Sequence, residues 1–187
     1  RGKRLYAVGP YVASKLLTDV PVTCALSALL GVLIYPLCGL RPGTQPFLAF
    51  LGLAVAEGVA SSALGLLLGA AAPTTEAALA MFPPLIVVMV IFNGYNIHPD
   101  SVPRYLRWVP SCSLVRWTFE GMVANEFAGL RFDPPPGLSP RMARRLGVPY
   151  LPTGEHVLEN LGFAQSTAGG CVAALGLISA VCWLLGL

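Results

Sequence analysis

The sequence predicts an all-α fold: a polytopic membrane helix bundle with four transmembrane helices, an N-terminal interfacial connecting helix and a re-entrant helical segment before the last span. Long stretches of the 187 residues carry almost no formal charge, and each reaches the roughly 20 residues that cross a bilayer as a helix. The chain is 55% hydrophobic and 11% charged, against about 25% charged in soluble domains. No segment alternates apolar and polar residues for long, and lipid offers the backbone no hydrogen-bond partners, so the spans are expected to be helices.

Residues 1–19 are predicted to form the connecting helix, which lies at the membrane surface. Apolar residues recur in it close to helical spacing, and Gly9-Pro10 is expected to kink or restart it. An excess of basic over acidic residues places this end of the chain on the cytosolic side of the membrane. The basic residues are Arg1, Lys3, Arg4 and Lys15, and the acid is Asp19.

Four apolar stretches are predicted to span the membrane. The turn before the third stretch contains Thr74 and Thr75, either of which could cap the helix that follows. Four crossings return the C-terminus to its starting side, so we expect an integral, multi-pass membrane protein with cytosolic N- and C-termini, whose immediate partner is the lipid bilayer. The predicted spans are residues 20–40, 46–70, 77–97 and 161–187.

The long polar region 98–160 is predicted to hold the re-entrant helices and an external loop. Its first part, 102–127, is rich in aromatic residues and helical in pattern. Tryptophans prefer the membrane interface, which suits a re-entrant or interfacial position. Pro110-Ser111 is expected to break this part into two short helices, with Ser111 or Ser113 as a cap. The second part is rich in proline and is expected to be irregular and exposed.

Several classes of function lack their signature residues. The only lysines are Lys3 and Lys15, and without a G-x-x-x-x-G-K-[ST] motif the chain has no P-loop to hold nucleotide phosphates. No G-x-S-x-G or H-E-x-x-H motif is found, so no catalytic residue is assigned. His98 and His156 are far apart, and the five cysteines form no C-x-x-C pair, so no metal or other cofactor is expected in this chain. The net charge of +3 is small, which disfavours nucleic acid as a partner.

Glu57 is the one ionisable side chain deep in a predicted span. A charge inside the membrane is costly, so such residues are functional candidates. The same helical face continues through Ser61, Gly65 and Gly69, and small residues at this spacing let two helices approach closely. We therefore expect Glu57 to point into the bundle. It is either a polar contact for substrate or protons, or a hydrogen-bonded acid that locks two helices together.

The third predicted span carries further candidates for a transport site. Pro83-Pro84 removes two amide donors, so this helix either kinks and lines a cavity, as broken helices do in transporters, or simply bends. Asn93, Tyr95 and Asn96 end the span at its outer face. There they either gate an exit or mark the interface with water.

Several motifs resemble, in order and in spacing, those of the ABCG (White/Brown-complex) half-transporters. Residues 116–127 are similar to the re-entrant segment of that family, with its Asn-Glu-Phe signature, and residues 1–21 resemble its connecting helix and the start of its third helix. Residues 73–78 and 153–155 look most like the plant-type branch. The re-entrant residues that carry the resemblance are Arg116, Trp117, Asn125, Glu126 and Phe127.

The resemblance implies the C-terminal part of an ABC-exporter membrane domain, with helices three to six of six. The ATP-binding domain, with its ATP and Mg²⁺, and the first two helices would lie upstream in a longer protein. A second half-transporter would complete a homo- or heterodimer. Arg1 and Tyr6 would belong to the helix that receives the motion of the nucleotide-binding domain. Residues expected along the central cavity or at its outer gate are Pro83, Val87, Val90, Tyr95 and Asn96.

The preferred function is therefore ATP-driven export of a hydrophobic or amphipathic molecule through a cavity at a dimer interface. The alternative is a non-transporting membrane scaffold or channel-like subunit built on the same bundle. A membrane-bound enzyme would require a catalytic cluster, and the sequence does not present one.

Overall fold

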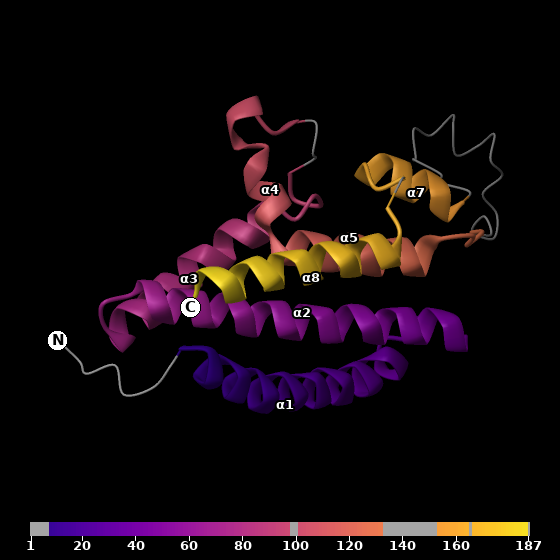
Figure 1. Ribbon diagram of the computed structural model, residues 1–187. Coiled ribbons are helices and arrows are strands. Elements are labelled where there is room, and N and C mark those ends of the chain that lie inside the picture. Colours follow the sequence, from indigo (N-terminus) through magenta and orange to yellow (C-terminus); the bar gives the residue numbers. More distant parts are fainter. Residues whose placement is uncertain (1–7, 98–100, 133–152, 165, 187) are drawn as a thin grey trace.

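The computed structural model describes residues 8–97, 101–132, 153–164 and 166–186. Regular secondary structure in these ranges is helical, which confirms the all-α prediction (Figure 1). An isolated antiparallel bridge joins Arg131 to Thr153. The predicted coupling residues Arg1 and Tyr6, and the proline-rich stretch 133–152, lie outside the described residues.

The first helix, α1, runs from Val8 to Leu37. The boundary predicted at residue 20, between a connecting helix and a first span, is absent from the described part, because residues 8–19 continue into 20–37 without a break. Pro10 lies in the first turn of α1. Amides in a first turn have no carbonyl acceptor within the helix, so a proline there removes no hydrogen bond. The helix ends before the predicted residue 40, and Gly39 follows in a left-handed conformation with a φ of 62°.

The next two helices form a hairpin. Helix α2, Thr44–Ala71, slightly exceeds its predicted bounds of 46–70. Helix α3, Thr75–Ile91, is capped by Thr74, whose hydroxyl accepts a hydrogen bond from the Ala77 amide. It is shorter than the predicted 77–97, because Asn93 and the residues after it form a turn instead of continuing the helix.

Within the described residues 101–132, the region predicted to be re-entrant contains the helices η2, α4 and α5. The 3-10 helix η2, Arg104–Leu106, is followed by α4, Trp108–Cys112, and by α5, Leu114–Phe127. The predicted break at Pro110-Ser111 is wrong by a few residues: Pro110 lies inside α4. The chain turns at Ser113, which has extended backbone angles and caps α5 by accepting a hydrogen bond from the Arg116 amide.

The predicted last span, 161–187, begins later in the structure, after a separate short helix that ends at Leu161. Helix α7, Gly154–Leu161, ends at Gly162, which adopts a φ of 75°. The main helix, α8, runs only from Ala168 to Leu185 and is capped by Thr167. The left-handed glycine explains the error, since the absence of charge does not reveal a break in the backbone.

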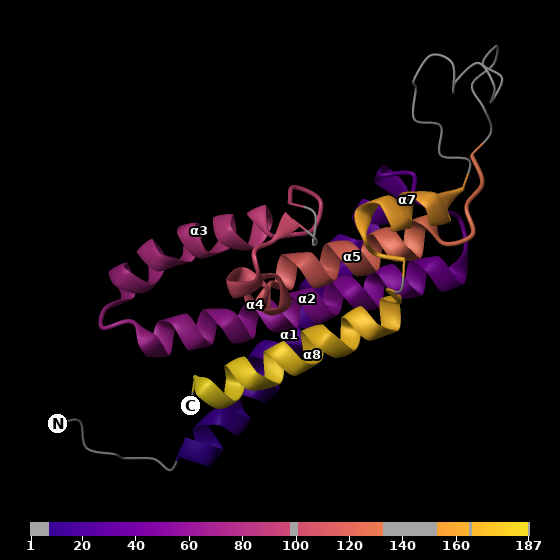
Figure 2. The ribbon, with the colours of Figure 1, turned by 90° about the horizontal axis from the view of Figure 1, so that it is seen from above.

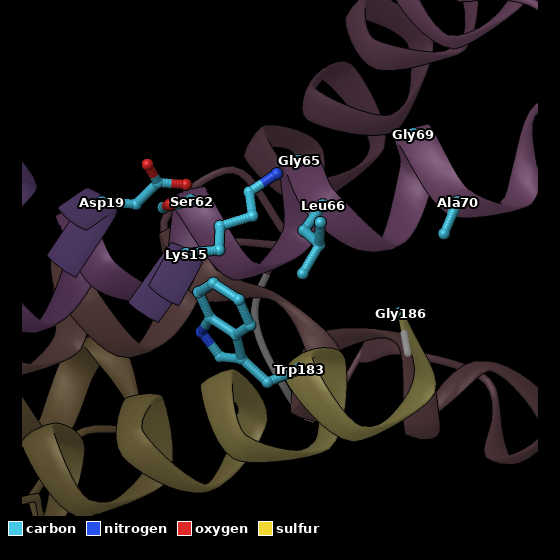
Figure 3. A pocket seen from close by; sticks show the side chains of 9 residues that line it. All are labelled: Lys15, Asp19, Ser62, Gly65, Leu66, Gly69, Ala70, Trp183 and Gly186. Carbon is cyan, nitrogen blue, oxygen red and sulfur yellow. The ribbon is translucent and has the colours of Figure 1, made fainter. Parts of the chain in front are cut away.

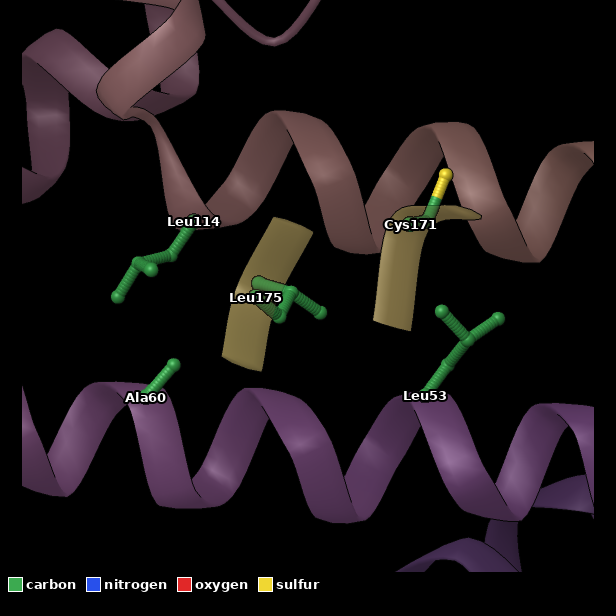
Figure 4. Packing of buried hydrophobic residues seen from close by; sticks show 5 residues of the cluster. All are labelled: Leu53, Ala60, Leu114, Cys171 and Leu175. Carbon is green, nitrogen blue, oxygen red and sulfur yellow. The ribbon is translucent and has the colours of Figure 1, made fainter. Parts of the chain in front are cut away.

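Helix α2 is the centre of the bundle. Helix α1 packs along one side of it, and α5 and α8 cover another side (Figures 1 and 2). One core cluster lies where α2, α5 and α8 meet (Figure 4). Its buried members are Leu53, Ala60, Leu114, Cys171 and Leu175.

Three described helical segments are long and apolar enough to cross a membrane: Ser14–Leu37, Thr44–Ala71 and Ala168–Leu185. Helix α3 is a shorter apolar helix of 17 residues. Many large apolar side chains face outward, such as Leu17 and Leu37 on α1, which are 77% and 83% exposed. An outward-facing apolar surface of this extent suits lipid rather than water, and the chain is an integral, multi-pass membrane protein.

Candidate functional site

Helix α3 presents an uncovered apolar surface. Both Pro83 and Pro84 lie inside it, and the helix continues through them to Ile91. Pro83 is exposed, and the side chains of Val87 and Val90 are 54% and 40% exposed. No residue of α3 is buried. The described part of this chain therefore leaves the predicted cavity residues open to a neighbour, to lipid or to a cavity.

Tyr95 and Asn96 belong to a tightly bonded turn at the end of α3. The side-chain oxygen of Asn93 accepts hydrogen bonds from the amides of both residues, at 3.0 and 3.1 Å. The amide group of Asn96 donates to the Val90 carbonyl, one of the carbonyls left free where the helix ends. The Tyr95 ring meets the edge of Phe119 with 6.0 Å between centroids, although Tyr95 is 67% exposed.

Glu57 joins α2 to α5. Its Oε2 accepts a hydrogen bond of 2.5 Å from the Thr118 hydroxyl, and its Oε1 accepts one of 3.0 Å from Ser61 in its own helix. The side chain is partly buried and also borders a cavity of about 230 Å³ between α1 and α2. Glu57 thus points into the bundle, in the geometry expected of an acid that links two helices.

A second acid, Glu120 on α5, is more deeply buried than Glu57, with 5% of its surface exposed. Its Oε2 lies 3.3 Å from Nε of Arg116, and its Oε1 accepts a hydrogen bond from Ser166. Arg116 in turn lies over the Trp117 ring, 5.1 Å from the centroid. The Trp117 indole donates a hydrogen bond to the Ser111 carbonyl. The ion pair lies within α5, and the hydrogen bond from Ser166 to Glu120 joins α5 to the segment that leads into α8.

Asn125 and Glu126 fasten the end of α5 to the start of α2 and to the connection before it. The Glu126 carboxylate accepts a hydrogen bond of 2.9 Å from the Arg41 amide. The Asn125 side chain donates one of 2.9 Å to the Pro46 carbonyl. The Arg41 guanidinium donates back to the Ala128 carbonyl. The first two residues of the Asn-Glu-Phe motif therefore bond to the connection between α1 and α2 and to the first turn of α2.

Phe127, the third residue of the motif, packs on the other side. It lies against a buried cluster of Ala124, Leu158 and Phe163, which joins α5 to α7. Its ring is 6.1 Å from that of Phe132. A Cβ atom at Gly154 would come within 1.9 Å of the Phe127 carbonyl oxygen, so only glycine fits at the start of α7.

The structure separates the candidates predicted from sequence into two groups. Glu57, Arg116, Trp117, Asn125, Glu126 and Phe127 all lie in the contacts of α5 with its neighbours. Pro83, Val87, Val90, Tyr95 and Asn96 belong to α3 or to the turn after it, and of these Tyr95 also touches α5, through Phe119.

Sequence reasoning missed Glu120 and two close-packing glycines. The four-residue spacing of Arg116 and Glu120 was the available signal for an ion pair on one helix. A Cβ at Gly121 would come within 2.6 Å of Leu53, and one at Gly58 within 2.1 Å of Ser27. The packing predicted at Gly65 and Gly69 is wrong within this chain, because a Cβ at either position would meet nothing within 4 Å.

The described residues present no cluster of metal ligands, and the sequence presents no nucleotide-binding loop. Within the described ranges, no three His, Cys, Asp or Glu side chains lie close enough to hold a metal. Neither Lys3 nor Lys15 follows the glycine-rich loop that would hold nucleotide phosphates.

Comparisons with known proteins agree on one family. The family described as "ABC-2 type transporter" matches residues 1–127. The chain is 37% identical to ABC transporter G family member 7 of Arabidopsis thaliana over 93% of the chain and 22% of that relative. It is 32% identical to Protein white of Ceratitis capitata over 87% of the chain and 23% of that relative. With human ATP-binding cassette sub-family G member 8 the identity is 31% over 71% of the chain and 20% of that relative. The chain thus spans less than a quarter of these relatives.

Proposed function

This chain belongs to the ABC-2 type transporter family and to its ABCG branch, and we propose that it is the membrane-spanning part of an ATP-driven exporter. The exporter moves a hydrophobic or amphipathic molecule through a cavity at a dimer interface. ATP hydrolysis, with Mg²⁺, takes place in a domain of the longer protein outside this chain. The chain spans less than a quarter of the length of these relatives, which supports the assignment of ATP hydrolysis to another part of the longer protein.

The observation that carries the proposal is the exposed apolar surface of α3. The described part of the chain buries no residue of α3 fully, and helices that are apolar all round are found buried or in lipid. In the proposed dimer, α3 is the third of four membrane-crossing helices of the chain, and its 17 residues are at the lower end of the length that spans a bilayer. Val87 and Val90 face the cavity, and the Tyr95-Asn96 turn closes its outer end.

The proposed topology places both termini in the cytosol. Its supports are the basic residues near Lys15 and the even number of crossings. The turn at Pro42 then lies on the extracellular or lumenal side, and the turn at Thr75 lies in the cytosol. Single cysteines at these two positions, in a background without the native cysteines, are expected to react with an impermeant maleimide from opposite sides. Reaction of both from one side contradicts the topology.

Vesicles containing the full-length transporter provide the test of function. We expect ATP-dependent efflux of a fluorescent amphiphile that stops when the upstream ATPase site is inactivated. Val87→Trp and Val90→Trp are expected to lower the efflux rate at unchanged expression. Leu177→Trp is the control, because Leu177 is 68% exposed on α8 instead of α3. Efflux that persists without ATPase activity rules out the exporter, and equal effects of all three substitutions rule out a cavity along α3.

A further inference from the structure

A cavity of about 510 Å³ opens between α1, α2 and α8, and the residues of the candidate site do not line it (Figure 3). Two charged residues of α1, Lys15 and Asp19, form one wall. Trp183 of α8 forms another, and Ser62, Gly65 and Gly69 of α2 lie along the floor. In the view of Figure 3 the Lys15 side chain extends toward Gly65, and Asp19 lies on the Ser62 side.

The two charges of this cavity are not paired with each other. Residues four apart on a helix have Cβ atoms about 5–6 Å apart, so Lys15 and Asp19 could form an ion pair. Neither has an ion pair or side-chain hydrogen bond within the part of the chain that the structure describes. Both are partly buried. An unpaired cation and an unpaired anion therefore border the same space, which suits a ligand carrying both charges.

The cavity lies at the ends of the membrane-crossing helices. Lys15 is the second residue of the first candidate span, and Trp183 is in the last turn of α8. Lysine and tryptophan are the side chains that membrane helices place at the level of the lipid headgroups. Leu17 and Leu184 lie on the same helices as Lys15 and Trp183 and are 77% and 73% exposed, so these helices also offer apolar surface to acyl chains.

The floor of the cavity is open because glycine occupies it. A Cβ atom at Gly65 or Gly69 would meet nothing within 4 Å. A larger residue at Gly65 would therefore project into the cavity without displacing a neighbouring helix. The fold does not need glycine there for packing, and a bound group is one reason for the space.

We propose that this cavity holds the headgroup of a resident phospholipid from the leaflet next to the N-terminal end of α1. The lipid is one that carries a phosphate and a primary amine, as phosphatidylethanolamine does. The Lys15 ammonium binds the phosphate, and the Asp19 carboxylate and the Ser62 hydroxyl accept hydrogen bonds from the amine. Trp183 covers the glycerol region. This lipid is a bound component of the membrane domain and not the exported molecule.

The test measures binding of short-chain phosphatidylethanolamine to the purified full-length transporter in detergent, by the shift of its thermal unfolding. We expect a saturable shift that exceeds the shift given by phosphatidylcholine or phosphatidylglycerol of equal chain length. Lys15→Gln is expected to raise the half-saturating concentration about tenfold, the value of one hydrogen bond to a charged group. Gly65→Leu, which fills the cavity, is expected to abolish the shift.

Gly52→Leu is the matched control, because Gly52 is exposed on the same helix and a Cβ there also meets nothing within 4 Å. It is expected to keep the full shift. The proposal is overturned if the wild-type protein shows no shift, as when another segment of the longer protein fills the cavity. It is also overturned if Gly65→Leu and Gly52→Leu behave alike, or if inorganic phosphate alone gives the same shift as the lipid.

Discussion

Thr118 on α5 donates a hydrogen bond of 2.5 Å to Glu57 on α2, across 61 positions of sequence. An acid in a membrane helix is costly unless its oxygens are bonded, and here Ser61 bonds the second oxygen. Both carboxylate oxygens of Glu57 are therefore occupied by hydroxyl groups of the bundle itself.

The first prediction concerns this link. Glu57→Gln is expected to keep most of the stability, because an amide oxygen still accepts a hydrogen bond from Thr118. Glu57→Leu leaves the hydroxyls of Thr118 and Ser61 without an acceptor and is expected to cost about 1–3 kcal/mol. Thermal unfolding in detergent measures both. If Glu57→Gln keeps its stability but loses transport, Glu57 acts on substrate or protons. Equal losses of stability in the two variants contradict the link.

The second prediction compares two glycines. Gly121→Ala is expected to destabilise the bundle by about 1–3 kcal/mol, because the new Cβ would lie 2.6 Å from Leu53 and 2.9 Å from Cys171. Gly65→Ala enters open space and is expected to be neutral or to gain up to about 1 kcal/mol from the better helix former. The unfolding temperatures of the two variants, measured side by side, show which glycine is required for packing. A loss at Gly65 as large as that at Gly121 would restore the packing interface predicted from sequence.

The third prediction concerns the buried pair of Arg116 and Glu120, whose side chains are 19% and 7% exposed. Arg116→Leu leaves the carboxylate buried without its cation and is expected to cost about 3–5 kcal/mol. The double variant Arg116→Leu with Glu120→Leu removes both charges and is expected to recover much of that loss. A double-mutant cycle on the unfolding free energy gives the coupling. Additive losses show that the two side chains do not interact.

The fourth prediction concerns the motif at the end of α5. Glu126→Ala removes the acceptor of the Arg41 amide, so this amide is expected to exchange its hydrogen faster, together with its neighbours in the α1–α2 turn. Hydrogen exchange with mass spectrometry measures the change. Glu159→Ala serves as the control, since Glu159 is exposed on α7. If the hydrogen-exchange rate near Arg41 is unchanged in Glu126→Ala, Glu126 does not hold the α1–α2 turn.

The fifth prediction concerns Tyr95. Tyr95→Phe keeps the ring that meets Phe119 and is expected to transport as the wild type does. Tyr95→Ala loses this contact at the outer end of α3 and is expected to change the transport rate or to increase leak. Efflux and passive dye release from the same vesicles separate the two effects. Wild-type kinetics in Tyr95→Ala exclude a gate at this position.

The sequence predicted helices well because the length of an uncharged stretch is itself a physical signal in a membrane protein. The long helices α1, α2 and α8 all fall within or around predicted spans. The ends were less accurate. Helices end at Gly162 and Ser113 because of the backbone conformation of these residues. Hydropathy carries no information on backbone dihedral angles.

The contacts between helices were harder to predict than the helices. Small residues recur at Gly58, Gly65, Gly69 and Gly121, but their spacing does not reveal which of them meets a neighbour. The structure places tight contacts at Gly58 and Gly121 and open space at the other two. For the same reason Glu57 was recognised and Glu120 was not: Glu57 interrupts an apolar run, whereas Glu120 lies in a stretch with other polar residues.

Helix α5 is held at its two ends by different partners. At its start, the Ser113 hydroxyl donates to the Met89 carbonyl of α3. At its far end, Glu126 bonds to the connection between α1 and α2, and Asn125 bonds to the first turn of α2. A tilt of α3 relative to those two helices would have to pull on one of these attachments. Helix α5 therefore couples α3 to the α1–α2 pair. We expect α3 to move together with these two helices and not independently of them.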